Sequence, residues 1–332
     1  MKAMVARELG SPNVLEMREV EQPSVGEWDL LIEVHACAVN PVDCKIRQTG
    51  FSGMLTPPLI LGFDVSGVVR ELGSAVDRDC FKVGDEVFAS PNLARPGANA
   101  QWVAVDSRTA AHKPGNIDHA QAAAFPLVTI TAWDGIHRRG RAHGHETVFI
   151  QGGAGGVGHI AVQLAKLRGC RVITTAGRDE SMALCRELGA DVVVNYQGED
   201  VPARVMQETD GRGCELVFDT IGGEAFLQAM RSVAVHGRLV SILAPPRDAP
   251  IHELFLRDVT LALEFMGAPT VFDTALKSHH RQLLQTVAEL IEVGKLRAHI
   301  GGRYALADLA EAHRQQETGH TMGKLVVDVA GV

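Results

Sequence analysis

A short apolar run, a glycine-rich turn and an amphipathic segment follow one another near the middle of the chain. The run Val148–Ile150 reads as a buried strand, and the segment 157–167 carries apolar residues at helical spacing. The turn between them contains Gly153, Gly155 and Gly158, which is the dinucleotide-binding spacing. The first glycine permits a tight turn, the second admits a pyrophosphate, and the third lets the helix pack closely. This context predicts nucleotide binding at the helix N-terminus, with a purely structural turn as the alternative.

Length and composition limit the number of domains, the kinds of partner and the cellular location that we expect. A length of 332 residues favours two domains, and a net charge of −8 without a basic cluster argues against nucleic acid as a partner. The longest glycine-free apolar run, residues 122–133, contains Pro126 and is too short to span a membrane. The N-terminus lacks a signal-peptide core, and the six cysteines form no Cys-x-x-Cys pair. We therefore expect a cytoplasmic enzyme with reduced thiols.

Residues 123–268 alternate between strand-like and helix-like segments. Strands are expected at 148–150, 171–175, 191–194, 215–219 and 238–242, with a sixth inside 259–265. Six strands separated by helices predict an α/β fold with a doubly wound parallel sheet, which is the Rossmann arrangement.

The two ends of the chain lack the alternating pattern of residues 123–268. Residues 1–122 contain short strand-like runs separated by Gly, Pro, Asn and Asp, which predicts a compact, β-rich, barrel-like domain. The tail 269–332 holds one strong helix at 280–292 and a strand at 322–329. A lone strand needs a sheet to join, so we expect it to return to the N-terminal domain and make that domain discontinuous. The pair His279-His280 is interpreted as a solvated surface pair and not as a metal site.

Eight short motifs occur in a recognisable order along the chain. They are AVNPVD (38–43), LGFDVSGVV (61–69), VGDEV (83–87), the glycine turn (153–158), LGAD (188–191), NY (195–196), DTIGG (219–223) and GKLV (323–326). With these motifs the chain resembles the medium-chain dehydrogenase/reductase superfamily over essentially its whole length, and especially its zinc-independent, zeta-crystallin-type quinone oxidoreductases. The resemblance implies a GroES-like catalytic domain (1–122 with 269–332), a Rossmann domain (123–268) and an active site in the cleft between them.

The resemblance also shows which residues occupy the metal positions of zinc-dependent relatives. Asn40, Phe63-Asp64 and about Leu127 stand where those enzymes carry Cys, His-Glu and Cys. An amide, a phenyl ring and an alkyl group cannot replace thiolate and imidazole ligands, and residues 88–110 contain no cysteine for a structural zinc. We therefore predict no metal. Without a Lewis acid, the remaining chemistry is hydride transfer to a conjugated acceptor such as a quinone or an α,β-unsaturated carbonyl.

Three polar residues on these motifs are candidate catalytic groups. Asn40 either donates its amide to a substrate oxygen or satisfies a local turn. Asp43 either orients Asn40 or caps a helix starting near Cys44. Asp64 either holds a water or pairs with a buried basic group. The residues expected to line the substrate pocket are Phe51, Leu127 and Phe265, with an exposed surface position as the alternative for Phe51.

The end of the second strand of the Rossmann domain bears on the choice of coenzyme. NAD-specific domains usually carry a carboxylate there, whereas this chain has Gly177 followed by Arg178, which can bind a 2′-phosphate. Tyr196 can add a hydrogen bond. The alternative is that Asp179 or Glu180 binds the ribose. The predicted NADP(H) contacts are Gly153, Ala154, Gly155, Gly156, Val157, Gly158, Gly177, Arg178, Tyr196, Ile221, Ile242 and Leu243.

These inferences predict a zinc-independent, NADPH-dependent oxidoreductase acting on quinones or α,β-unsaturated carbonyls. One alternative is an enoyl- or alkenal-type double-bond reductase, and another is a non-enzymatic NADPH-binding protein. A homodimer is expected, because the apolar segment 259–265 would leave an open sheet edge that a second copy can pair with. The resemblance points to the same assembly.

Overall fold

The computed structural model describes residues 1–331. The chain divides into two compact units. Unit 1 consists of Met1–Leu127 together with the chain from Gly267 onward, and unit 2 consists of Val128–Met266. No helix among the described residues has both the length and the apolar character that a membrane span requires.

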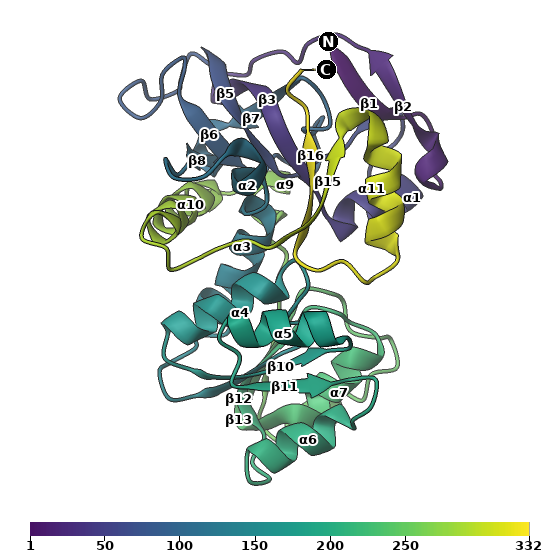
Figure 1. The fold of residues 1–332 in the computed structure, drawn as a ribbon, viewed down its shortest axis with the longest axis vertical. Helices are drawn as coiled ribbons and strands as arrows, with labels where there is room; N and C mark the ends of the chain where they lie inside the picture. Colours follow the sequence, from purple (N-terminus) through teal and green to yellow (C-terminus); the bar gives the residue numbers. More distant parts are fainter. Residues whose placement is uncertain (332) are drawn as a thin grey trace. The chain divides into compact units, whose positions relative to one another are not determined.

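Unit 2 is built on a parallel sheet of six strands in the order β11-β10-β9-β12-β13-β14. The order runs outward in both directions from β9, so the winding reverses between β11 and β12. Helices α4 and α5 cover one face of the sheet, and α6 and α7 cover the other (Figure 1). The predicted doubly wound parallel sheet is confirmed. The elements are α3 (Pro126–Trp133), the π-helix Asp134–Arg139, β9 (Thr147–Ile150), α4 (Gly158–Leu167), β10 (Arg171–Ala176), α5 (Asp179–Glu187), β11 (Val192–Asn195), α6 (Val201–Glu208), β12 (Cys214–Asp219), α7 (Glu224–Ser232), β13 (Val233–Ser241), α8 (His252–Leu256) and β14 (Thr260–Leu263).

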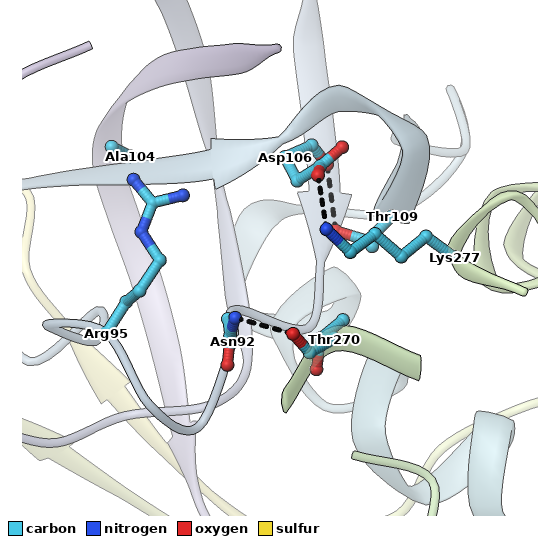
Figure 2. Close-up of a pocket in the computed structure, with 7 residues that line it drawn as sticks. All are labelled: Asn92, Arg95, Ala104, Asp106, Thr109, Thr270 and Lys277. Atoms are coloured by element: carbon cyan, nitrogen blue, oxygen red, sulfur yellow. Dashed lines mark hydrogen bonds and ion pairs between the residues drawn. The ribbon is translucent and has the colours of Figure 1, made fainter. Parts of the chain in front are cut away.

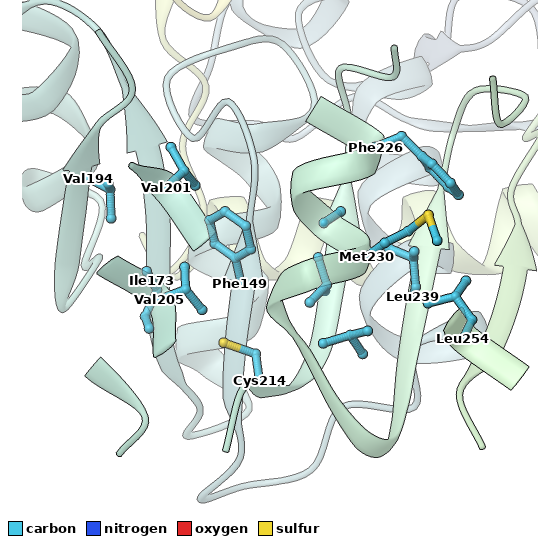
Figure 3. Packing of buried hydrophobic residues seen from close by; sticks show 13 residues of the cluster. Phe149, Ile173, Val194, Val201, Val205, Cys214, Phe226, Met230, Leu239 and Leu254 are labelled. Carbon is cyan, nitrogen blue, oxygen red and sulfur yellow. The ribbon is translucent and has the colours of Figure 1, made fainter. Parts of the chain in front are cut away.

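One face of this sheet carries an apolar core against α6, α7 and α8. Phe149 and Ile173 from the strands meet Phe226 and Met230 from α7, and all four are at most 1% exposed (Figure 3). The neighbours of Phe149 along β9 are also buried, because helices cover both faces of a parallel sheet. Each such side chain contributes about 1.5–3 kcal/mol on burial, so this core fixes the helices on the sheet.

Unit 1 contains a three-stranded sheet (β2-β1-β4) and a seven-stranded sheet in which the long strand β3 pairs with β5, β7 and β16. Strand β16 runs antiparallel to β3, with Val326 opposite Ala38. The predicted return of the C-terminal strand to the N-terminal domain is therefore confirmed. The strands are β1 (Lys2–Ala6), β2 (Leu15–Glu19), β3 (Asp29–Val39), β4 (Leu59–Ile60), β5 (Val65–Leu72), β6 (Glu86–Ala89), β7 (Trp102–Asp106), β8 (Ala110–His112), β15 (Ile300–Ala305) and β16 (Lys324–Asp328).

Five α-helices and three 3₁₀ turns of unit 1 surround these sheets. They are η1 (Pro12–Val14), α1 (Pro41–Gly53), η2 (Ser107–Thr109), α2 (His119–Ala123), α9 (Ala268–Val271), α10 (Lys277–Glu292), η4 (Leu306–Asp308) and α11 (Leu309–Glu317).

Helix α1 begins at Pro41, earlier than the predicted start near Cys44. The carboxylate of Asp43 accepts the backbone N–H of Asn40, which precedes the helix, at 2.7 Å. This contact satisfies an N–H group that has no acceptor within the helix. Asp43 therefore stabilises the start of α1 from its third position, and the predicted location of the cap was wrong because Pro41 already fits the first helical position.

The interpretation of His279-His280 as a solvated pair is wrong for His280. Helix α10 begins at Lys277 and places His280 on the same face as Leu283, Leu284 and Val287, three, four and seven residues further on. All four side chains are at most 3% exposed, whereas His279 is only partly buried. Helical periodicity thus buries the second histidine fully and leaves the first partly accessible.

A buried arginine joins α1 to α11. Arg47 is fully buried, pairs with Glu317, donates to the carbonyl of Gly10 at 3.0 Å and donates to Nδ1 of His313 at 3.0 Å. Because a guanidinium only donates hydrogen bonds, Nδ1 of His313 must accept, and the ring is neutral. Burial, and secondly the charge of Arg47, lower the pKa of His313 to about 3.

The substitution His313→Gln should make the stability of the protein less sensitive to acid. The pKa of His313 is about 3 in the folded state and about 6.5 in an unfolded chain. The unfolded state therefore binds more protons between these values, and stability falls as the pH drops below about 6.5. At pH ~5 this loss amounts to about 2 kcal/mol relative to pH ~7.5, and His313→Gln removes it.

Urea unfolding of wild type and variant at both pH values measures this difference. Groups that titrate identically in the two proteins cancel in the comparison. The exposed His252, changed to Gln, provides the control. An equal loss of stability in wild type and His313→Gln would contradict the assignment of a neutral, buried ring.

Candidate active site

The glycine-rich turn of unit 2 is closely packed. Gly152 has φ of +68°, where side chains are disfavoured. A Cβ on Gly153 would lie 2.2 Å from Oγ1 of Thr174, and a Cβ on Gly158 would lie 2.0 Å from the carbonyl oxygen of Gly152. The spacing had predicted that Gly153 permits the tight turn. The structure instead places the left-handed residue at Gly152, and Gly153 is required by its contact with Thr174.

Two threonines at the end of β10 hold this turn in place. Oγ1 of Thr175 accepts the N–H of Gly152 at 2.9 Å, and the carbonyl of Thr175 accepts the N–H of Gly153 at 3.1 Å. Thr174 donates to the carbonyl of Ile150 at 2.6 Å. Sequence reasoning missed these roles, although both residues lie at the expected strand end. Since α4 begins directly after the turn, at Gly158, its positive dipole end faces the region where a pyrophosphate would bind.

The residues expected to select the coenzyme lie beside the end of β10. A Cβ on Gly177 would lie 2.5 Å from the ring of Tyr196, so the absence of a side chain lets this ring pack there. Tyr196 is 49% exposed, and Arg178 is exposed. The acids Asp179 and Glu180 occupy the first turn of α5, where a negative charge favours the helix dipole. The structure thus brings Gly177, Arg178 and Tyr196 together at one strand end.

The remaining predicted coenzyme residues follow strands β12 and β13. The carboxylate of Asp219 accepts the N–H groups of Ile221 and the next residue at 2.9 and 2.8 Å, and the hydroxyl of Ser241 at 2.7 Å. Ile221 is 55% exposed, while Ile242 and Leu243 are partly buried. These three apolar residues therefore lie at the carboxyl edge of the sheet, the edge at which open α/β sheets bind ligands.

In unit 1, a buried ion pair gathers the positions that sequence analysis singled out. Asp64 accepts hydrogen bonds from Nζ of Lys324 at 3.0 Å, from Nδ2 of Asn40 at 2.8 Å and from the N–H of Leu127 at 2.7 Å. Lys324 also donates to Oδ1 of Asn40 and to the carbonyl of Val39. Of the two alternatives for Asp64, the structure has the pairing with a buried basic group. Lys324 is the member that sequence reasoning missed.

The two carboxylates of this region are fully buried. Burial raises the pKa of Asp64, while Lys324, Asn40 and Leu127 counteract the shift by stabilising the charged form. Burial also raises the pKa of Asp43 to about 7, although it accepts the N–H groups of Asn40 and Gly62 at 2.7 and 2.9 Å. Asp43 thus contacts the backbone of Asn40, and Asp64 contacts its side chain.

The predicted pocket residues are found in different surroundings. Phe51 is partly buried in a left-handed stretch, with φ of 53°. Leu127 is 8% exposed and its N–H is bound by Asp64. Phe265 belongs to unit 2 and is 38% exposed.

Unit 1 also contains a pocket of about 270 Å³, lined mainly by apolar residues, that sequence analysis did not find. Its walls come from Ile46 of α1 and from residues of the segments 54–63 and 93–96, and only Thr56 and Arg95 are polar. Phe63, the chain neighbour of Asp64, is part of the lining. The pocket can take a neutral apolar group, because both terminal nitrogens of Arg95 are bound to the carboxylate of Asp29.

A smaller cavity of about 30 Å³ in unit 1 is polar. Figure 2 shows Lys277 reaching Asp106, at 3.2 Å, and the amide of Asn92 reaching the backbone of Thr270, at 2.9 Å. The cations are paired with carboxylates, and the volume suits about two water molecules. This cavity therefore stabilises a polar junction of the fold and offers no excess charge to a ligand.

Two family models and several known proteins match the chain. The models are "Alcohol dehydrogenase GroES-like domain" over residues 26–125 and "Zinc-binding dehydrogenase" over residues 188–327. A zinc-type alcohol dehydrogenase-like protein of Staphylococcus aureus is 31% identical over 96% of both chains. The chloroplastic NADPH-dependent alkenal/one oxidoreductase of Arabidopsis thaliana is 33% identical over 98% of this chain and 79% of its own. The chain belongs to the medium-chain dehydrogenase/reductase superfamily.

A solved structure extends the similarity to the quinone oxidoreductases of the superfamily. The quinone oxidoreductase of Pseudomonas syringae superposes with a TM-score of 0.90 at 27% identity, covering 99% of this chain and 100% of its own. The predicted family and its combination of a GroES-like and a Rossmann domain are confirmed, and the chain is an oxidoreductase of this superfamily.

The donor set around Asp64 does not fit the catalytic zinc of the metal-dependent superfamily members. At the ligand positions the resemblance assigns, this chain has the amide of Asn40, the buried ring of Phe63 and the alkyl group of Leu127. Thiolates and imidazoles are absent from these positions, and the ammonium of Lys324 would repel a metal cation. Among residues 1–331, no three His, Cys, Asp or Glu side chains form a group that could hold a metal ion.

Proposed function

We propose that this chain is a zinc-independent, NADPH-dependent reductase of quinones or α,β-unsaturated carbonyls. The observation that carries the proposal is the ion pair of Asp64 and Lys324, which joins Asn40 and Leu127 where metal-dependent relatives place their ligands. A site without a Lewis acid requires an acceptor whose own conjugation stabilises the developing charge. Quinones and enones meet this requirement, and simple ketones do not.

The coenzyme half of the proposal rests on the turn at Gly152–Gly158 and on Arg178. When bound, the coenzyme supplies the hydride. The turn receives the pyrophosphate against the start of α4, and Ile221, Ile242 and Leu243 offer apolar contacts at the sheet edge. Arg178 can hold a 2′-phosphate through two parallel hydrogen bonds, with the hydroxyl of Tyr196 as a further donor.

On the substrate side, the amide of Asn40 donates a hydrogen bond to the carbonyl oxygen that gains charge during hydride transfer. Stabilising that oxygen selectively in the transition state is the usual task of such a donor. The apolar pocket beside Phe63 receives the ring or alkyl part of the substrate. Reduction of an alkenal double bond is the second candidate, and the alkenal/one oxidoreductase of Arabidopsis thaliana supports it.

Turnover of NADPH against a panel of carbonyls tests the function. A quinone and a straight-chain enone should both be reduced, whereas the saturated ketone of equal length should not. Along an enone series, kcat/KM should rise about fourfold for each methylene buried, until the apolar pocket is filled. A metal chelator should leave every rate unchanged.

The outcomes of this panel separate the alternatives. Reduction of enones without quinones favours the double-bond reductase, and the opposite result favours the quinone reductase. Stoichiometric zinc whose removal abolishes turnover would refute the metal-free mechanism. Tight NADPH binding without turnover on any conjugated carbonyl would indicate a non-enzymatic role.

Coenzyme choice can be tested at Arg178. The substitution Arg178→Ala should weaken NADPH binding by about 2 kcal/mol, the usual loss for a charge-assisted hydrogen bond, and barely affect NADH. Fluorescence titration with both coenzymes measures the two dissociation constants. Arg186→Ala, also on α5 and exposed, is the control for a general loss of positive charge. Equal losses for both coenzymes would instead favour ribose binding by Asp179 or Glu180.

We further propose a homodimer formed through β14. Among the described residues this strand pairs only with β13, so its other edge is open to a second copy. Leu263 on β14 is 52% exposed, and Phe255 and Leu256 on the preceding helix α8 are 82% and 75% exposed. An open edge beside exposed apolar side chains is a surface that association would cover.

The substitution Leu263→Asp should shift this dimer to monomer at micromolar concentration, because it places a charge where apolar contacts would form. Sedimentation velocity measures the change. Val83→Asp, at a site in unit 1 that is 58% exposed, should leave the assembly intact. A wild-type protein that sediments as a monomer would refute the proposal.

A further inference from the structure

The ammonium of Lys324 has no capacity left for a substrate. It carries three hydrogens and donates to three acceptors: the carbonyl of Val39 at 3.1 Å, Oδ1 of Asn40, and Asp64 at 3.0 Å. Only 2% of Lys324 is exposed. Any effect of Lys324 on chemistry must therefore pass through the groups that it holds.

The side chain of Asn40 is the group most constrained by this arrangement. Its Oδ1 faces the ammonium of Lys324, and its Nδ2 faces the carboxylate of Asp64 at 2.8 Å. A flipped amide would point NH₂ at the ammonium and the carbonyl oxygen at the carboxylate. Both contacts would then be repulsive, so the ion pair permits only one orientation of the amide.

In this orientation, one hydrogen of Nδ2 is committed to Asp64 and the other has only a weak partner. The second contact, to the carbonyl of Ala38, is 3.5 Å long, well beyond the usual length of about 2.9 Å. An ammonium on the amide oxygen polarises the amide and strengthens its N–H groups as donors. Asn40 is 1% exposed, so bulk water does not compete for this donor, and a substrate oxygen has to replace the weak contact to Ala38.

Stability alone gives little reason to keep such an ion pair. Desolvating two charges offsets most of their attraction, and apolar replacements of buried pairs are often equally stable. The pair is also neutral as a whole, so it supplies no net positive charge to a substrate. Its distinctive property is the fixed direction that it imposes on Asn40.

We propose that Lys324 is a positioning residue that, together with Asp64, holds the amide of Asn40 so that Nδ2 donates to the carbonyl oxygen of the substrate. This proposal rests on the proposed function, because it assigns the origin of the hydrogen-bond donor in that reaction. Lys324 itself does not touch the substrate. Its removal should reduce kcat through Asn40 and leave coenzyme binding in unit 2 unaffected.

Steady-state kinetics of four variants with NADPH and a quinone or enone test the proposal. Asn40→Ala should lower kcat by about 100-fold, as removal of such a donor does in other enzymes. Lys324→Met should lower kcat by about 10-fold or more, with KM and the NADPH dissociation constant near wild type. Lys324→Arg, which can still donate to Oδ1, should recover part of the loss. Adding Lys324→Met to Asn40→Ala should cause no further loss.

A merely structural role predicts different results. In that case Lys324→Met would lower the unfolding midpoint, while kcat of the folded fraction stayed at the wild-type value. Alternatively, the losses in kcat caused by Lys324→Met and Asn40→Ala would multiply in the double variant. Either result overturns the proposal. If Lys324→Met fails to fold, Lys324→Met/Asp64→Asn leaves no unpaired buried charge and carries the same expectation. Wild-type protein that reduces no conjugated carbonyl overturns the proposed function as well, whereas active wild type with an unaffected Lys324→Met overturns this inference alone.

Discussion

The carboxylate of Asp64 holds together parts of unit 1 that are far apart in the sequence. It accepts from Asn40 at the start of α1, from the N–H of Leu127 and from Lys324 in the strand β16, 260 residues away. A fully buried carboxylate is tolerated only when its charge is compensated and its lone pairs are satisfied. The positions of these segments therefore depend on one another. The contacts with Asp64 and Lys324 also fix the orientation of the candidate donor Asn40.

An ammonium and a zinc ion organise such a centre in different ways. A catalytic zinc keeps an open coordination position through which it polarises the substrate directly. The ammonium of Lys324 directs its three hydrogens to three protein acceptors and keeps none for a ligand. A centre of this kind can orient a neighbouring amide but cannot replace a Lewis acid. The proposed preference for a conjugated, already electron-poor substrate follows from this difference.

The fold of unit 2, the proposed coenzyme-binding half, was easier to predict from the sequence than the candidate substrate site in unit 1. The six-stranded sheet of unit 2 follows from alternating apolar and amphipathic segments. Strand β15 was not predicted, because Gly301-Gly302 and alternating exposure leave no apolar run in this segment. The role of Lys324 was not predicted, because a lysine in a strand is expected to be solvated and its acceptor Asn40 lies 284 residues away in the sequence. Local periodicity carries no information about such partners.

This contrast has a physical origin. A pyrophosphate cradle is made of backbone, so it constrains residue type at fixed spacing. Although the role of Gly153 was misassigned, the spacing predicted the turn where it is observed, between β9 and α4. The substrate side is made of side chains from distant segments, where an amide, a ring and an alkyl group can take the places of metal ligands while the fold persists. In this chain, the residues around one buried carboxylate therefore differ in chemistry from metal ligands while the architecture that presents them stays that of the superfamily.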